Sequence, residues 1–162
     1  MSYNDYSQGK EIKRINDYNN DEYPTGSKII MMVNNVKNPE EVLAKTKEVM
    51  LAVSQFAYTD NWPTDEEWKT ILPEWFVQSM TDKTSRDRDK DPHQWHYESW
   101  VYNIKMRSWV WWSSKIGDDY VKITLEAIDM PYLHDSFKYI FYSQGIPMKD
   151  IADNDDIYDK TK

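Results

Sequence analysis

SWVWWSSKIGDDYVKITLEAI, residues 108–128, is the stretch that decides the fold. In residues 121–127 apolar and polar side chains alternate, the period of two that is typical of a strand with one face in a core. Residues 109–112 are apolar at every position, so we expect a partner strand covered on both faces, or one whose second face binds something outside the chain. The Gly-Asp-Asp at residues 117–119 has the composition of a hairpin loop.

The amino-terminal part of the chain is polar and precedes a short apolar run. Residues 1–26 are rich in asparagine and acidic side chains, which predicts a flexible or loosely docked arm. Ile12, Ile15 and Tyr18 are at helical spacing, so a short amphipathic helix docked on the body is the alternative. The apolar run at residues 28–33, closed by two asparagines, predicts a buried strand.

Two helix starts are marked by capping residues. Asn38 precedes Pro39 and two glutamates, which combines a capping side chain, a proline at the first helical position and acids at the positive end of the helix dipole. Apolar side chains at spacings of three and four predict that this helix runs to about Tyr58. Thr64 and Glu67 have the spacing of a capping box and predict a second helix.

The remaining segments follow the same patterns. Residues 81–92 alternate in charge, which predicts an exposed connector. Residues 100–107 alternate between apolar and polar side chains, so we expect a third strand that forms a meander with the hairpin. A helix is expected to open at residues 134–136 and to end at Gly145. Residues 150–162 carry many aspartates and predict an acidic tail.

Together these elements predict one α+β domain, residues 27–149, between the arm and the tail. We expect a mainly antiparallel sheet of about four strands, one from residues 28–33 and three from residues 95–128, with helices packed on one face. A chain of 162 residues is long enough to bury a sizeable core in a single domain.

The balance of charge restricts the class of partner. The chain has 28 acidic and 20 basic side chains, a formal net charge of -8, which repels nucleic acids and anionic membranes and attracts basic surfaces. The alternative is that the acidity only keeps the protein soluble. Cysteine is absent, and no apolar run has the length of a membrane span, so we expect a cytoplasmic protein without disulfides.

The sequence contains no motif that specifies a reaction. His93, His96 and His134 lack a metal-ligand pattern, and no Gly-x-Ser-x-Gly elbow is present. The four glycines are scattered, so no phosphate-binding loop is indicated. We therefore expect no catalytic residue, no metal and no cofactor.

Interaction chemistry remains, because tryptophan and tyrosine are the rings that concentrate binding energy at interfaces, and acids beside them steer basic partners. The hairpin and its flanks combine both kinds of side chain. The expected partner-binding residues are Trp109, Trp111, Trp112, Asp118, Asp119, Tyr120, Glu126 and Asp129.

The last third of the chain resembles the immunity proteins encoded beside polymorphic toxins of bacteria. The resemblance lies in the order of residues 109–114, the hairpin with residues 122–126, the Pro-Tyr at 131–132 and the aromatic helix at 137–146. It implies a non-enzymatic cytoplasmic protein that neutralises one cognate toxin by occluding its active site or an adjoining surface. Many such toxins are basic nucleases, which agrees with the acidity of this chain.

Two other classes of function remain open. One is a ligand-binding or adaptor module that uses an aromatic face for sugars, peptides or lipids, and a deep ring-lined pocket would favour it. The other is an enzyme with a dispersed acid–base site around His93, His96, His134 and nearby acids, which would need those side chains to converge.

Overall fold

The computed structural model describes residues 8–80, 95–128 and 134–153. Within these ranges the chain has the predicted α+β fold, with a four-stranded antiparallel sheet in the order β2-β3-β1-β4. The strands are β1 (Lys28–Val33), β2 (Trp109–Ile116), β3 (Val121–Ala127) and β4 (Ile151–Asp153). The helices are α1 (Gln8–Asp17), α2 (Pro39–Ser54), α3 (Asp65–Ile71), α4 (Glu74–Ser79), α6 (Tyr97–Lys105), α7 (Asp135–Tyr142) and the 3-10 turn η2 (Met148–Asp150).

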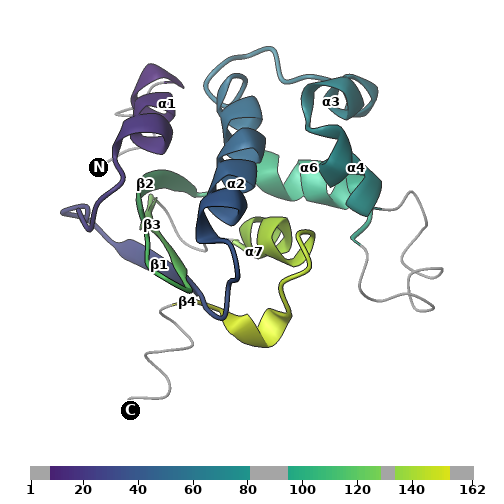
Figure 1. Cartoon of the computed structure of the whole chain (residues 1–162). Helices are drawn as coiled ribbons and strands as arrows, with labels where there is room; N and C mark the ends of the chain where they lie inside the picture. Colours follow the sequence, from purple (N-terminus) through teal and green to yellow (C-terminus); the bar gives the residue numbers. More distant parts are fainter. Residues whose placement is uncertain (1–7, 81–94, 129–133, 154–162) are drawn as a thin grey trace.

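The elements are arranged in three tiers (Figure 1). The sheet lies on one side, α2 and α7 lie in the middle, and α3, α4 and α6 lie on the far side of them. Helix α1 stands apart from this stack, beside β2 and the end of α2. The core is continuous from the sheet through the middle helices to the outer ones.

The predicted hairpin is confirmed. Strands β2 and β3 pair from Trp109 opposite Ala127 to Ile116 opposite Val121, with one shift of register at Trp112. The first half of β2 is covered on both faces, as its uninterrupted apolar sequence indicated: Trp109, Val110 and Trp111 are all 0% exposed. On β3 the apolar and polar side chains alternate between the two faces of the strand, as predicted. The polar face is nevertheless also covered in part, because Thr124 and Glu126 are only 2% exposed.

The prediction of a strand at residues 100–107 is wrong, because this segment lies in helix α6 and the turn after it. Trp100, Val101 and Ile104 are buried at helical spacing, and the indole nitrogen of Trp100 donates to the carbonyl of Ser136 at the start of α7. Trp100 and Ile104 are four residues apart and share one helix face, so they fit a helix as well as a strand, whereas Tyr102 and Met106 of the same alternating set are exposed. The expected three-stranded meander is therefore only a two-stranded hairpin.

The fourth strand comes from a different part of the chain. Strand β4 pairs antiparallel with β1, so that Met31 lies opposite Asp153 and Val33 opposite Ile151. It lies at the beginning of the range predicted to be an acidic tail, and residues 154–162 lie outside the described residues. The sheet thus has the expected number of strands with a different fourth member.

The capping signals are confirmed. The side-chain oxygen of Asn38 accepts the backbone N–H of Glu41 at the start of α2, and Thr64 and Glu67 form a reciprocal capping box at the start of α3. Helix α2 ends at Ser54 and is followed by turns, so it stops before the predicted Tyr58. The predicted connector at residues 81–92 lies outside the described residues.

The amphipathic helix that was the alternative for the arm is present as α1. Helix α1 is docked rather than loosely held, since the side chains of Glu11 and Ile15 are both 0% exposed. Glu11 accepts two hydrogen bonds from the Arg107 guanidinium, at 2.9 and 2.6 Å, and others from Ser54, Tyr58 and the backbone N–H of Trp111. This buried ion pair connects α1 to α2 and to β2.

Candidate functional site

Two of the expected partner-binding rings belong to the core. Trp109 and Trp111 are 0% exposed and pack edge-on against Phe137 of α7, with ring centroids 5.2 and 5.9 Å apart. When both faces of a strand are apolar, its sequence does not tell which face packs in the core. In this protein α7 covers the face of β2 that carries Trp109 and Trp111. Neither ring offers a surface to a partner in this structure.

Three more of the expected partner-binding residues, Trp112, Glu126 and Asp129, do not belong to the hairpin loop. Trp112 occupies the irregular position of β2, where the Arg14 guanidinium lies 3.4 Å from its ring centroid. Glu126 is buried near the opposite end of β3. Asp129 lies outside the described residues.

The hairpin loop itself is on the surface and has a fixed shape. Asp118 and Asp119 are exposed, and the Gly117 N–H donates to the Tyr120 carbonyl at 3.0 Å. The Tyr120 ring lies directly against Gly117, where an added Cβ would be 2.0 Å from a ring carbon. Glycine is therefore required at 117 for the tyrosine ring to close over the loop.

Hydrogen bonds connect two further segments, residues 34–41 and 148–150, to the same end of the molecule. The Val36 N–H donates to the Asp119 carbonyl at 2.8 Å, and the Asn34 N–H donates to the Asp150 carbonyl at 2.8 Å. Asn35, at a positive φ of 57°, donates from its side-chain amide to the Asp150 carboxylate at 2.9 Å. We call this surface the hairpin end, and it comprises residues 34–41, 117–120 and 148–150.

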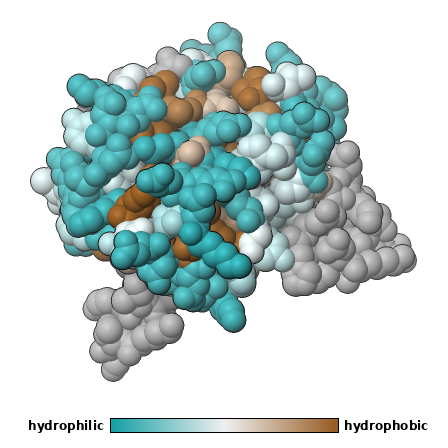
Figure 2. All heavy atoms as spheres, in the orientation of Figure 1, coloured by the Kyte–Doolittle hydropathy of each residue, from teal (hydrophilic) through white to brown (hydrophobic). Residues whose placement is uncertain are grey.

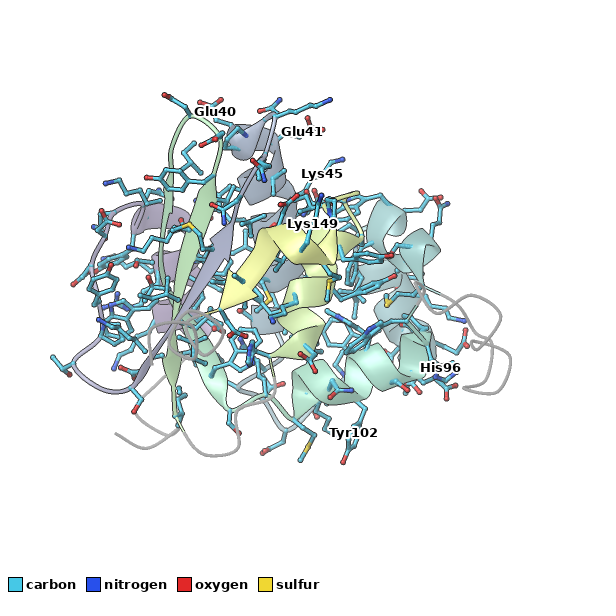
Figure 3. All side chains as sticks on the ribbon, turned by 90° about the horizontal axis from the view of Figure 1, so that it is seen from below. Glu40, Glu41, Lys45, His96, Tyr102 and Lys149 are labelled. Atoms are coloured by element: carbon cyan, nitrogen blue, oxygen red, sulfur yellow. The ribbon has the colours of Figure 1, made fainter. Side chains whose placement is uncertain are left out.

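Carboxylates outnumber cations at the hairpin end. Lys45, one turn along α2, pairs with Glu41 at 3.5 Å, whereas Glu40, Asp118 and Asp119 form no ion pair with another described residue. Figure 3 shows Glu40 and Glu41 projecting at the end of α2 beside the loops, with Lys45 further along the helix. Five acids and two lysines belong to the surface as defined: Glu40, Glu41, Asp118, Asp119, Asp150, Lys37 and Lys149.

Away from the hairpin end, many cations are already engaged with rings. A guanidinium or ammonium lies within 6 Å of the centroid of several buried or half-buried rings, a distance at which the ring face attracts the charge. Such contacts cover the rings and hold the cations in place. The pairs are Arg14 with Trp112, Lys45 with Trp75, Lys69 with Tyr97 and Lys105 with Trp62.

Other cations are engaged with acids on the outer face of the sheet. Lys115 and Lys122 lie opposite each other across the hairpin, and the Asp21 carboxylate accepts from them at 2.7 and 3.2 Å. The hydrogen bond from Lys115 lowers the pKa of Asp21, and the same bond raises the pKa of Lys115. Burial alone would lower the pKa of Lys122, but its hydrogen bonds to Tyr23 and Asp21 raise it.

The two described histidines have different partners. His96 contacts the Ser99 hydroxyl at the start of α6, whereas His134 pairs with Asp153 at the end of β4. His93 lies outside the described residues. In the parts of the chain that the structure describes, no three His, Cys, Asp or Glu side chains are grouped so that they could hold a metal ion.

No described helix combines the length and the apolar character needed to cross a membrane. No protein-family model, curated protein or solved structure matches this chain.

Sequence patterns alone do not place every residue of the hairpin end on one surface. The sequence marks Glu40 as an acid at a helix start, Asn35 as a turn residue and Asp150 as part of an acidic segment. A signal was present in the paired asparagines 34 and 35, which predict a turn immediately after a strand. The contact of that turn with the hairpin loop depends on the pairing of β1 with β3.

Proposed function

We propose that this protein acts by binding a basic surface of another protein through the hairpin end. The observation that carries the proposal is the set of exposed carboxylates of Glu40, Asp118 and Asp119, which form no ion pair with another described residue. Glu40 lies in the first turn of α2, and the loop that holds Asp118 and Asp119 is hydrogen-bonded to Val36, shortly before this helix. Uncompensated charge of one sign raises the rate of encounter with a surface of the opposite sign.

The rigidity of these loops favours tight binding. Ordering a mobile loop on association costs free energy, and a surface that is already ordered avoids that cost. The Gly117–Tyr120 contact and the bonds of Asn34 and Asn35 to Asp150 hold the loops before any partner arrives. Met148, 53% exposed, supplies an apolar contact of the kind that interfaces favour within the same surface.

Hydrophilic residues dominate the face of the molecule shown in Figure 2, where apolar residues form only separate patches. A partner that recognises this face through apolar contacts alone would find little continuous area. Polar contacts would therefore have to supply much of the recognition on that face.

For the partner we propose a cognate bacterial toxin domain, which this protein neutralises by covering its active site or an adjoining surface. The support is the resemblance of residues 109–146 to immunity proteins, together with the acidity of the chain. A protein of this kind would act in the cytoplasm of the cell that makes the toxin.

The test is co-expression with toxin domains from the genomic neighbourhood of this gene, followed by measurement of complex formation and association rate. Asp118→Asn/Asp119→Asn removes two charges from the hairpin end. Glu48→Gln/Asp60→Asn is the matched control, because both acids are exposed, lie outside the hairpin end and form no ion pair with a described residue.

We expect the Asp118/Asp119 variant to associate about ten-fold more slowly than the wild type, and the control to stay within about two-fold. Raising the salt from about 50 to about 200 mM should slow the wild type more than the Asp118/Asp119 variant, because screening removes the same attraction. Equal slowing of both variants would show that only net charge matters and would refute the assignment of the surface. Failure to protect cells or to form any complex would refute the function.

A further inference from the structure

Two large apolar side chains are exposed one turn apart on helix α6. Among the described residues four large hydrophobic side chains are exposed, and Tyr102 and Met106, at 63% and 51%, are two of them. Tyr102 lies within α6 and Met106 caps its end four residues later, so the two side chains fall on one face of the helix. Figure 3 shows Tyr102 projecting from α6 away from the sheet and the other helices.

The charged side chains beside these two have opposite signs. Glu98 lies in the first turn of α6 and Lys105 in the last, and both are exposed. Residues seven apart on a helix project from nearly the same side, so both charges lie along one edge of the face, the edge where the Lys105 ammonium is 5.9 Å from the Trp62 ring centroid. Neither charge forms an ion pair with another residue in the described parts of the chain. We call Glu98, Tyr102, Lys105 and Met106 the α6 face.

The charges of the α6 face are complementary to those of a second copy of the same face. When two identical helices pack antiparallel about a two-fold axis, the beginning of each lies beside the end of the other, and equivalent edges meet. An axis beside Tyr102 therefore places Glu98 of each copy next to Lys105 of the other, with the two tyrosine rings at the centre. A parallel pairing would place like charges together, which costs free energy.

We propose that the α6 face binds a second copy of this chain, so that two antiparallel α6 helices form the centre of a dimer interface. The occupant follows from the signs of the charges. Lys105 disfavours a basic partner and Glu98 an acidic one, whereas a second copy pairs with both. Helix α6 has nine residues, a length of about 13 Å, so its face buries less than the roughly 800 Å² per partner of a standard interface. The dimer is therefore weak and forms only at high protein concentration.

Such a dimer leaves the hairpin end accessible. In Figure 3 Tyr102 lies on the opposite side of the molecule from Glu40 and Glu41. Each dimer thus carries two hairpin ends, both away from the interface between the copies. The inference does not rest on the proposed function, because the α6 face and the hairpin end share no residue.

The test is analytical ultracentrifugation of the full chain from about 10 to about 500 μM, the range in which a small interface is expected to dissociate. We expect the wild type to pass from monomer to dimer over this range. Tyr102→Glu places two like charges at the centre of the interface and should weaken dimerisation at least about ten-fold. Met148→Glu is the matched control, because it adds the same charge at another exposed apolar side chain, and it should leave the dissociation constant within about two-fold of the wild type.

Exchanging the two charges tests the antiparallel arrangement. Glu98→Lys and Lys105→Glu each create two like-charge contacts in the dimer, so each should weaken it about ten-fold. The double variant makes both contacts attractive again and should return to within about three-fold of the wild type. A wild type that stays monomeric over the whole range, a Tyr102→Glu variant that dimerises like the control, or a double variant no tighter than the single ones would overturn the proposal.

Discussion

Replacing Arg107 with methionine tests whether the buried pair with Glu11 stabilises the fold. The side chains of Arg107 and Glu11 are 1% and 0% exposed, and the guanidinium makes two of the hydrogen bonds to the carboxylate. Methionine leaves a charged carboxylate in the interior with only neutral donors from Ser54, Tyr58 and Trp111. Removing one partner of a buried pair costs about 3–5 kcal/mol, because the remaining charge is uncompensated.

The pH dependence of this cost has a definite sign. Burial alone would raise the pKa of Glu11, but the charge and hydrogen bonds of Arg107, with the Trp111 N–H and the Ser54 hydroxyl, hold it below its usual value. In the wild type this carboxylate therefore contributes stability above the unfolded-state pKa of about 4.3 and loses that contribution as the pH falls. Without Arg107, burial is no longer opposed by the opposite charge, so the pKa of Glu11 rises and the folded variant takes up a proton at a higher pH than the wild type does. The cost of the substitution should then shrink on acidification.

The assay is urea unfolding followed by tryptophan fluorescence, at pH 7 and at about pH 5. At pH 7 we expect a loss of about 3–5 kcal/mol, equivalent to a fall in melting temperature of roughly 6–20 °C for a chain of this size. Glu11→Gln added to Arg107→Met should recover at least about 1 kcal/mol at pH 7, because the charge is gone while an acceptor remains for Trp111. Lys45→Met is the control for loss of a cation at an exposed pair, and should cost less than about 1 kcal/mol. A loss below about 1 kcal/mol for Arg107→Met, or an equal loss at both pH values, would refute the reasoning.

Two further substitutions test local features. Gly117→Ala should displace the Tyr120 ring, since the added Cβ would lie 2.0 Å from a ring carbon; the check is a change in the Tyr120 ring signals by NMR, and Gly9→Ala, where nothing lies within 4 Å of the added Cβ, should leave them unchanged. Thr64→Ala should remove the capping box of α3 and cost about 0.5–2 kcal/mol in thermal unfolding. Thr64→Ser loses only the methyl group, keeps the hydroxyl and should retain most of the stability, and equal losses for both would mean that the cap contributes nothing.

The elements with local signals were predictable from the sequence. The hairpin of β2 and β3 has its own alternation and loop residues, and the starts of α2 and α3 are set by Asn38 and Thr64, whose side chains bond to backbone groups three residues away. Both partners of a capping or turn interaction lie within a few residues of each other, so a short stretch of sequence is enough to predict it. The exposed position of Asp118 and Asp119 follows from the same local chemistry.

Helix α6 and strand β4 were decided by tertiary contacts. Residues 100–107 satisfy the period of a strand and that of a helix, and the packing of Trp100 on α7 selects the helix. Strand β4 has three residues, too few for any period to be visible, and exists because β1 offers an unpaired edge to Ile151–Asp153. Neither outcome is encoded in a pattern that a short window can reveal.

The sequence by itself determined the α+β class, the hairpin and its acidic loop, because backbone geometry and side-chain period act over short distances. Only the tertiary structure decided which rings are covered, which loops meet at the hairpin end, and that Glu11 is a core residue. The Glu11 carboxylate is stable in the interior because Arg107, 96 residues along the chain, supplies the opposite charge. An acid in a polar segment gives no sign of such a partner, since a charge is buried only where the fold brings its counter-charge within hydrogen-bonding distance.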